Sequence, residues 1–264
     1  MIEYRGPCFC SGNCQGQDNQ PVAIFRYLPT LALMTAPSKN IALLLFLRNE
    51  VQEAAAKPLA AKGRRVDRVI YRQLNQYTRR QAQSSGLPLL VVKGSRQSGT
   101  TFGERLANAF EYAFSRGYER VIAIGNDCLA LDAARLKNAA RLLEQSGLAL
   151  GPAKDGGVYL LGLSRRAYNR QLFLGLPWQT DRLFSALGQY AHRVRFSVLL
   201  LPMEEDADDA VSFQRLLACL PSKSKLRQAL VKLLSLAIPP LYALLLPLSD
   251  QQQHTIPKRG PPLC

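Results

Sequence analysis

Acidic residues and glycines follow hydrophobic runs at several points of the chain, and these residue types can bind metals and phosphates. Asp127 comes directly after Gly125 and Asn126, where the apolar run 120–125 ends. One carboxylate can suffice for Mg²⁺, which often takes its other ligands from phosphate oxygens and water. The pattern therefore predicts a divalent-metal ligand at Asp127. The alternative is that Asp127 starts a turn or caps a helix near Leu131.

A second loop carries an aspartate followed by two glycines, Asp155, Gly156 and Gly157. Glycine tolerates positive φ and lets a ligand approach the backbone closely, so this loop is a candidate ligand contact. A plain turn that joins two strands is the alternative.

The loop 94–101 resembles a phosphate-binding loop in the spacing of its glycines. The lysine that would reach the terminal phosphates is replaced by Thr100, so we exclude a P-loop NTPase. Gly99 and Thr100 remain candidate ligand contacts. After the run 40–47, Arg48 and Lys57 could hold phosphates, or they could belong to an exposed charged segment in which Glu53 and Lys57 form an ion pair.

Five acids occur within residues 204–209, in a chain whose net charge is +15. These carboxylates could complete a metal site or cap a helix that begins near Ala210. The chain has two histidines and no Gly-x-Ser-x-Gly elbow, which gives little support to a hydrolase triad. A transferase that positions a nucleotide with a metal and backbone dipoles needs no histidine.

Alternating strands and helices are expected to position these loops. The hydrophobic pattern predicts strands at 40–47, 87–93, 120–125, 148–151 and 158–163, and helices at 64–84, 102–116 and 133–146. Such alternation predicts a right-handed, mostly parallel sheet covered by helices on both faces. Ligands of such sheets bind at the carboxyl ends of the strands, where the loops above begin.

Three segments are expected along the chain. Residues 1–39 form an extension that is disordered or not native, 40–221 the folded domain, and 222–264 a basic and apolar extension with a disordered end. No transmembrane span is expected, because Lys232 and two prolines interrupt the apolar tail, although the tail could contact a membrane surface. The cysteine distribution predicts no disulfide framework and a cytoplasmic location. No basic patch with interleaved aromatic residues appears, so no nucleic-acid partner is expected.

Several ordered motifs carry a family resemblance over about residues 40–220. In chain order they are Phe102-Gly103-Glu104-Arg105, Ile124-Gly125-Asn126-Asp127-Cys128, the run from Leu150 through Asp155-Gly156-Gly157-Val158-Tyr159 to Leu163, Leu172-Phe173 and Pro177-Trp178-Gln179-Thr180. They resemble a bacterial domain-of-unknown-function family labelled as glycosyltransferases of arsenosugar biosynthesis. That family is similar to nucleotide-diphospho-sugar transferases of the GT-A fold and to guanylyltransferases of molybdopterin and deazaflavin cofactors.

The resemblance implies a GT-A, Rossmann-like α/β fold with three α/β/α layers and a mixed, mostly parallel sheet. It implies Mg²⁺ or Mn²⁺ as cofactor, and a nucleotide sugar or NTP and a small acceptor as partners. The site residues it implies, together with those chosen above, fall into three groups. The metal ligands are Asp127, Asp206 and Asp208; the nucleotide contacts are Arg48, Lys57, Gly99, Glu104, Arg105, Gly125 and Asn126; the sugar or acceptor contacts are Gly156, Gly157, Tyr159, Trp178 and Thr180.

The leading functional hypothesis is a metal-dependent glycosyltransferase, in which Asp127 holds the metal and Asp155 orients or deprotonates the acceptor hydroxyl. A nucleotidyltransferase that releases pyrophosphate is the first alternative. Many relatives carry a Lys-Thr-Arg-Leu-type motif in the first loop, whereas this chain has only Arg48 and Lys57 there. That departure makes a non-catalytic nucleotide-binding module the second alternative.

Overall fold

The structure is a computed structural model that describes residues 25–26, 40–60 and 63–236. Its elements are, in chain order, β1 (Phe25–Arg26), β2 (Ile41–Leu47), α1 (Glu50–Ala56), α2 (Arg64–Ser84), β3 (Leu89–Lys93), a 3₁₀ turn (Gly94–Arg96), α3 (Phe102–Ser115), β4 (Arg120–Ile124), α4 (Ala133–Gln145), β5 (Leu148–Pro152), β6 (Val158–Ser164), α5 (Arg170–Leu174), α6 (Leu183–Val194), β7 (Val198–Leu200), α7 (Ala210–Cys219) and α8 (Lys225–Leu236).

The strands form one sheet in the order β1-β7-β5-β6-β4-β2-β3. β6 runs antiparallel to both of its neighbours, β4 and β5, and the other paired strands are parallel. β2 is buried on both faces, which explains its uninterrupted aliphatic sequence. The carboxyl ends of β2, β3 and β4 lie at one edge of the sheet, and the chain enters β6 at that same edge.

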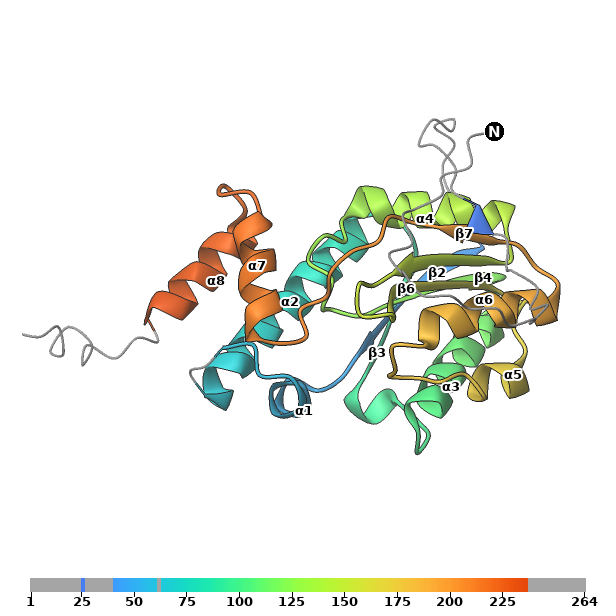
Figure 1. Ribbon diagram of the computed structural model, residues 1–264, viewed down its shortest axis with the longest axis horizontal. Helices are drawn as coiled ribbons and strands as arrows, with labels where there is room; N and C mark the ends of the chain where they lie inside the picture. Colours follow the sequence, from blue (N-terminus) through green and yellow to red (C-terminus); the bar gives the residue numbers. More distant parts are fainter. Residues whose placement is uncertain (1–24, 27–39, 61–62, 237–264) are drawn as a thin grey trace, which may run out of the picture.

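Helices cover both faces of the sheet (Figure 1). α3, α5 and α6 pack on one face, where Phe110, Phe173 and Leu187 are fully buried. α4 packs on the other face through Leu136 and Leu143, and Ala82 of α2 joins it there. The structure therefore has three α/β/α layers.

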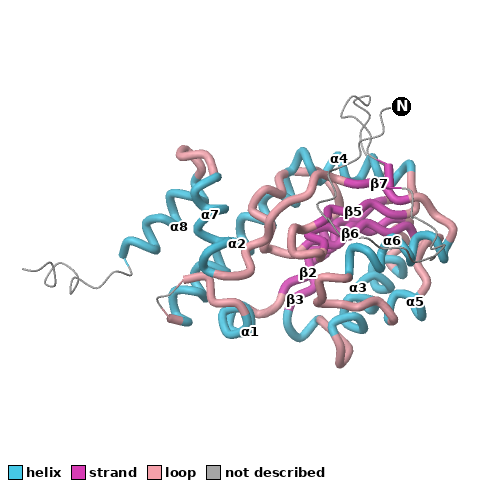
Figure 2. The backbone as a smooth tube through the Cα atoms, viewed as in Figure 1, coloured by secondary structure: helices cyan, strands magenta, loops and turns pink. Residues whose placement is uncertain are grey.

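A helical cluster lies at one end of the sheet, formed by α1, α2, α7 and α8 (Figure 2). Tyr71 and Leu74 of α2, Phe213 of α7 and Leu230 of α8 are buried in it. The cluster places α1 and the segment before α7 against the edge where β2 and β4 end.

The predicted fold class, a three-layer α/β fold with a mixed, mostly parallel sheet, is confirmed. The helix predicted at 64–84 has those bounds, and the other predicted helices and strands are present with ends shifted by one or two residues. The sequence analysis missed β7, α1, α5 and α6. β7 has only three residues and α5 only five, too few for a periodic pattern to show.

Parts of the predicted terminal extensions, 1–24, 27–39 and 237–264, lie outside the described residues. Within the predicted N-terminal extension, Phe25–Arg26 form β1 and pair with β7. Within the predicted C-terminal extension, α8 packs against α2. Among the residues that the structure describes, no helix is long and apolar enough to cross a membrane.

Candidate functional site

A cavity of about 520 Å³ opens at the edge of the sheet where β2 and β4 end. Segments distant in sequence line it: the ends of β2 and β4, the first turns of α3, the loop before β6, and the loops before α6 and α7. The polar lining residues are Arg48, Glu53, Lys57, Gln97, Arg105, Asn126, Asp127, Asp155, Gln179, Thr180, Asp181, Asp206 and Asp208.

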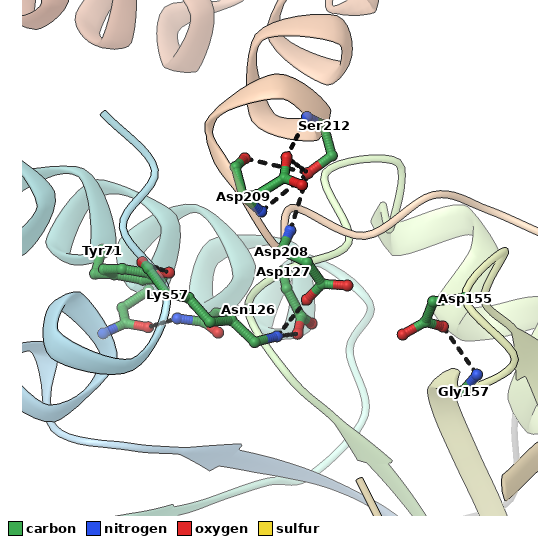
Figure 3. A network of polar contacts seen from close by, with 10 residues as sticks. Lys57, Tyr71, Asn126, Asp127, Asp155, Gly157, Asp208, Asp209 and Ser212 are labelled. Atoms are coloured by element: carbon green, nitrogen blue, oxygen red, sulfur yellow. Dashed lines mark hydrogen bonds and ion pairs between the residues drawn. The ribbon is translucent and has the colours of Figure 1, made fainter. Parts of the chain in front are cut away.

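One end of this cavity is acidic, and we call it the acidic end: it comprises Asp127, Asp206 and Asp208. Lys57 lies against Asp127 and Asp208 (Figure 3). Lys57 Nζ lies 3.5 Å from Asp127 Oδ2 and forms a short ion pair with Asp208 Oδ1. Burial alone would lower the pKa of Lys57, but Asp127 and Asp208 raise it above its usual value. Lys57 is therefore charged at neutral pH and partly neutralises the acidic end.

Lys57 is positioned by hydrogen bonds from α2 to the segment that follows α1. The Tyr71 hydroxyl donates to the Lys57 carbonyl oxygen at 2.7 Å. Oδ1 of the buried Asp67 accepts from the backbone N–H groups of Leu59 and Ala60 at 3.0 and 2.7 Å. α2 thus fixes the chain on which Lys57 is carried.

The two acidic segments are joined directly, because the backbone N–H of Ala207 donates to the carbonyl oxygen of Asp127 at 3.0 Å. Asp209 caps α7 and forms a capping box with Ser212, which fixes the backbone next to Asp208. The helix-cap reading of the acidic cluster is therefore right for Asp209. Asp132 caps α4, so the cap alternative for Asp127 is wrong.

Asp206 is the least stabilised side chain of the acidic end. Its Oδ1 is buried and has no hydrogen-bond partner. Burial, followed by repulsion from Asp127, Asp208 and Asp155, raises the pKa of Asp206 to about 9. A buried carboxylate oxygen without a partner lowers the stability of the folded protein, so a cation bound at this point would raise that stability.

Asn126 has a supporting role as well as a place on the cavity wall. Its amide Nδ2 donates to Asn75 Oδ1 at 2.7 Å, and Asn75 in turn donates to Glu50 Oε1 at 3.1 Å. This buried chain of amides ties the loop after β4 to α2 and α1. Figure 3 shows Asn126 directed toward α2, whereas Asp127 faces Lys57 and Asp208.

Asp155 lies on the other side of the cavity from the acidic end (Figure 3). Its Oδ1 accepts from the backbone N–H of Gly157 at 2.8 Å, which holds the carboxylate over the loop before β6. Gly156 has φ of +86°, and a Cβ there would lie 2.0 Å from the carbonyl oxygen of Asp181. The glycine is required because the backbone before α6 comes this close.

An aromatic wall closes the cavity beside Asp155, formed by Phe46, Phe102 and Trp178. The ring centroids of Phe102 and Trp178 are 5.7 Å apart, and those of Phe46 and Phe102 are 5.8 Å apart. Trp178 Nε1 donates to the carbonyl oxygen of Phe173 at 2.9 Å. A Cβ on Gly103 would lie 2.6 Å from Trp178 Cδ1, so Gly103 leaves the space that the indole ring occupies.

The loop 94–101 reaches the cavity through Gln97, whose amide donates to the carbonyl oxygen of Leu47 at 2.7 Å. Glu104 forms a capping box with Thr101, and hydrogen bonds from the Thr100 hydroxyl and the backbone lower the pKa of Glu104 to about 2. Arg105 donates to the carbonyl oxygen of Thr100 at 2.8 Å and lines the cavity.

Most of the predicted site residues meet at this cavity. Gly99, Thr100, Glu104 and Gly156 are not among its lining residues, and they shape the loops beside it. The alternative of an exposed Glu53–Lys57 pair is wrong, because Glu53 is buried and Lys57 pairs with Asp127 and Asp208.

Sequence reasoning did not select six of the polar or aromatic residues that line the cavity: Phe46, Glu53, Gln97, Phe102, Gln179 and Asp181. Phe46 is an aromatic residue near the carboxyl end of β2, and that position could have identified it as a lining residue. Gln179 stands in the Pro177-Trp178-Gln179-Thr180 motif, but its φ of 63° shows only in the folded chain.

The donor set at the acidic end consists of carboxylate oxygens, which suit Mg²⁺ or Mn²⁺. Within residues 25–26, 40–60 and 63–236, no three acidic, histidine or cysteine side chains are grouped closely enough to hold a metal by themselves. The orphaned oxygen of Asp206 nevertheless fits a cation. The residues therefore fit a metal that takes further ligands from a bound phosphate and displaces the Lys57 ammonium.

Residues 49–180 match the family described as "Uncharacterized protein conserved in bacteria (DUF2064)", and the chain belongs to this family. The resemblance drawn from the sequence motifs is thereby confirmed at the level of the family. A comparison with curated proteins finds no match.

Among solved structures, the chain is similar to a protein of Desulfovibrio desulfuricans G20 described as a "putative nucleotide-diphospho-sugar transferase". The identity is 23%, the similarity covers 75% of this chain and 96% of that chain, and the TM-score is 0.66. The two chains share a fold.

Two further similarities are weak, each with a TM-score of 0.37. Rv0371c of Mycobacterium tuberculosis H37Rv in complex with manganese is 14% identical over 68% of this chain and 99% of that chain. CMP:2-keto-3-deoxy-manno-octonic acid synthetase complexed with CTP is 9% identical over 73% and 98%. A TM-score this low does not indicate a shared fold.

Proposed function

We propose that the protein is a glycosyltransferase that binds a nucleotide-activated sugar with Mg²⁺ or Mn²⁺ and transfers the glycosyl group to a small acceptor. One observation carries the proposal. Asp127, Asp206 and Asp208 converge at one end of a cavity that also contains Arg48 and Arg105 and has Asp155 on its opposite side. A cavity with carboxylates, guanidinium groups and an aromatic wall matches the charge and shape of a nucleotide diphosphate joined to a sugar.

Asp127, Asp206 and Asp208, completed by phosphate oxygens of the ligand, would hold the metal, which would supply charge neutralisation to the diphosphate leaving group. Arg48, Arg105 and Lys57 bind the phosphate oxygens by ion pairing. Lys57 leaves Asp127 and Asp208 for the phosphate when the ligand enters, because it lines the same cavity as Arg48 and Arg105. Each cationic group stabilises the negative charge that grows on the leaving group during transfer.

Asp155 binds the acceptor and takes the proton from its attacking hydroxyl. It lies in an exposed loop at the mouth of the cavity, which admits an acceptor from solvent. Gly157 brings the backbone close to the sugar, and Gly156 allows the backbone before α6 to approach this loop. Trp178 supplies an apolar face, and Tyr159 and Thr180 complete the sugar side.

The second candidate is nucleotidyl transfer from an NTP to a phosphorylated small molecule, with release of pyrophosphate. It is favoured by a smaller hollow that shares Arg48, Gln97 and Arg105 with the main cavity and continues toward Gly94 and Ser95. The second hollow gives room for a third phosphate, and Arg48 and Arg105, which line both hollows, supply positive charge to bind it. The non-catalytic nucleotide-binding module would use the same pocket without turnover.

The test is an assay of the full chain with nucleotide sugars and with NTPs, each with and without Mn²⁺, that identifies the released product. A nucleoside diphosphate supports glycosyl transfer, and pyrophosphate supports nucleotidyl transfer. Asp127→Asn should lower turnover by about a hundredfold or more, since it removes a charge that acts on the leaving group. The matched control is Asp132→Asn, because Asn caps a helix as well as Asp and Asp132 is not among the residues that line the cavity.

If Asp127→Asn and Asp132→Asn are equally active, the acidic end does not catalyse. If neither the wild type nor any variant turns over any donor, but nucleotides still bind, the non-catalytic module is the correct function.

A further inference from the structure

Glu53 is a buried carboxylate at the candidate site that the proposed function does not use. It lies on α1, is only 8% exposed, and lines the main cavity. Among the described residues, none forms a hydrogen bond or an ion pair with its carboxylate. A buried carboxylate without a partner lowers the stability of the folded protein, so its place on a cavity wall indicates a ligand that supplies one.

The carboxylate oxygens of Glu53 keep contact with open space. In the described part of the chain, the fully buried side-chain atoms without a hydrogen-bond partner are Arg141 Nε and Asp206 Oδ1. The oxygens of Glu53 have no partner either but are not among these atoms, so they are not sealed in the protein. The space that Glu53 lines is the cavity, and a ligand bound there can reach these oxygens.

The neighbouring polar side chains of α1 have structural roles that Glu53 lacks. Asn49 caps the helix, and its Oδ1 accepts from the backbone N–H of Val51 at 2.8 Å. Glu50 accepts from Asn75 at 3.1 Å and forms an ion pair with Lys93. These contacts fix α1 at the end of β2. They hold Glu53 at the cavity without using its carboxylate.

Glu53 lies toward the cationic side of the cavity. Burial, followed by repulsion from Asp127, raises the pKa of Glu53, whereas Arg48 and Lys57 oppose that rise. Both cationic side chains are therefore close enough to act on its charge. Among the residues that the structure describes, no three acidic side chains are grouped to hold a metal, so Glu53 is not a further ligand beside Asp127 and a second acid.

The chemistry of a carboxylate narrows the group that could bind to Glu53. An ionised carboxylate only accepts hydrogen bonds, so it repels phosphate and needs O–H or N–H donors. In a nucleotide the ribose is bonded directly to the phosphate. A phosphate bound by Arg48 and Lys57 therefore brings the ribose hydroxyls near Glu53, while the transferred sugar extends toward Asp155. Carboxylates bind ribose hydroxyls in the same way in other nucleotide-binding α/β folds.

We propose that Glu53 accepts a hydrogen bond from a ribose hydroxyl of the bound nucleotide and so selects ribonucleotides over their deoxy analogues. This proposal rests on the proposed binding of a nucleotide in the cavity, and it holds for glycosyl transfer and for nucleotidyl transfer alike.

The test is calorimetric titration of the full chain at pH 8 with Mn²⁺. The ligands are ADP, CDP, GDP and UDP, followed by the 2′-deoxy and 3′-deoxy analogues of the diphosphate that binds most tightly. The test variant is Glu53→Met, which keeps the length of the side chain and removes the acceptor. The control variant is Glu119→Met, which loses the same charge at an exposed position that does not line the cavity. Thermal denaturation without ligand checks that both variants fold.

The Glu53→Met change has two effects of opposite sign. Loss of a negative charge beside Arg48 and Lys57 should strengthen the binding of any phosphate compound. Loss of the acceptor should weaken only a ligand that carries the contacted hydroxyl. We expect Glu53→Met to bind the ribonucleoside diphosphate at least about fivefold more weakly, because a hydrogen bond to a charged group is lost.

The analogue that lacks the contacted hydroxyl should bind to Glu53→Met as tightly as to wild type or more tightly. Wild type and Glu119→Met should prefer the ribonucleoside diphosphate to that analogue by about tenfold. Glu53→Gln, which keeps a neutral acceptor, should restore part of the preference. The melting temperature of ligand-free Glu53→Met should not fall, since the carboxylate has no partner in the described part of the protein.

Three results would overturn this proposal while leaving nucleotide binding intact. The first is that Glu53→Met binds the ribonucleoside diphosphate as tightly as wild type does. The second is that it loses the same factor for the deoxy analogues, which would assign Glu53 a structural role. The third is that it weakens only nucleotide sugars, which would place the transferred sugar at Glu53. A wild type that binds none of the diphosphates, with or without Mn²⁺, would overturn the proposed function as well.

Discussion

The acidic end and the aromatic wall face the same cavity but differ in how they are stabilised. At the acidic end, Lys57 neutralises Asp127 and Asp208 only in part, and Asp206 keeps a buried oxygen without a partner. In the wall, the ring of Trp178 contacts Phe102 and Phe173, and its N–H donates to a carbonyl oxygen. The wall stabilises the fold, whereas the acidic end lowers stability in a way that a cation would reverse.

This difference separates two kinds of residue at one site. Changes in the wall should lower stability whether or not a metal is present. Changes at the acidic end should alter stability by an amount that depends on divalent cations, because Asp206 Oδ1 has no partner and Lys57 neutralises Asp127 and Asp208 only in part. The predictions below test this separation, beginning with the largest effect.

Gly103→Ala should destabilise the wall by about 2 kcal/mol, because the new methyl group would overlap the ring of Trp178. Urea denaturation followed by Trp178 fluorescence measures the loss, and Mn²⁺ should not restore it. Gly175→Ala is the control, since its Cβ would meet no atom closer than 3.6 Å. Equal losses in the two variants would show that overlap with the ring of Trp178 does not decide the effect.

Lys57→Met should lower the free energy of unfolding by about 1–2 kcal/mol without metal, a value reduced for partial solvent screening. The reason is that Asp127 and Asp208 lose their cationic partner. Thermal denaturation with and without Mn²⁺ measures the effect, and Mn²⁺ should recover most of the loss. A loss that Mn²⁺ leaves unchanged would contradict the role of Lys57 as an internal counter-ion.

Asp206→Asn should raise the free energy of unfolding of the metal-free protein by about 1 kcal/mol or more at pH 8. The pKa of Asp206 is higher in the folded protein than in the unfolded chain, so the ionised carboxylate disfavours folding above the unfolded pKa. The gain should be small near pH 4, grow as the pH rises, and level off above about pH 9. The same variant should lose the stabilisation by Mn²⁺. A variant that is less stable than wild type at pH 8 would contradict this account.

Thr101→Ala should cost about 1 kcal/mol, because α3 loses the side chain that accepts from the backbone N–H of Glu104. Thr101→Ser keeps the hydroxyl and serves as the control. Chemical denaturation of both variants measures the difference. This cap supports the wall, so Mn²⁺ should not change the loss of unfolding free energy. A loss that depends on Mn²⁺ would contradict the claim that only the acidic end responds to cations.

The fold could be predicted from sequence where the pattern is long and regular. α2 extends over 21 residues and β2 is continuously apolar, so periodicity located both. β7 is a three-residue strand whose pairing with β1 and β5 depends on contacts distant in sequence. Such short elements are stabilised by the neighbouring strands and not by a local pattern.

Residues of the candidate site could be predicted where an acidic residue stands in a loop at the end of a strand. Asp127 and Asp155 stand in loops at strand ends, and both line the cavity. The sequence could not show that Lys57 leaves its helical neighbour Glu53 for Asp127, since that choice depends on how α1 packs against α2. Nor could it show which acid of residues 204–209 is buried without a partner.

The most direct test of the central claim is calorimetric titration of the full chain with a panel of nucleotide sugars and NTPs, with and without Mn²⁺. The account predicts that one nucleotide-activated ligand binds with Mn²⁺, that binding weakens by at least about tenfold without the metal, and that Asp127→Asn removes this dependence while Asp132→Asn does not. Equal affinity with and without Mn²⁺, or an Asp127→Asn variant with unchanged metal dependence, would contradict it.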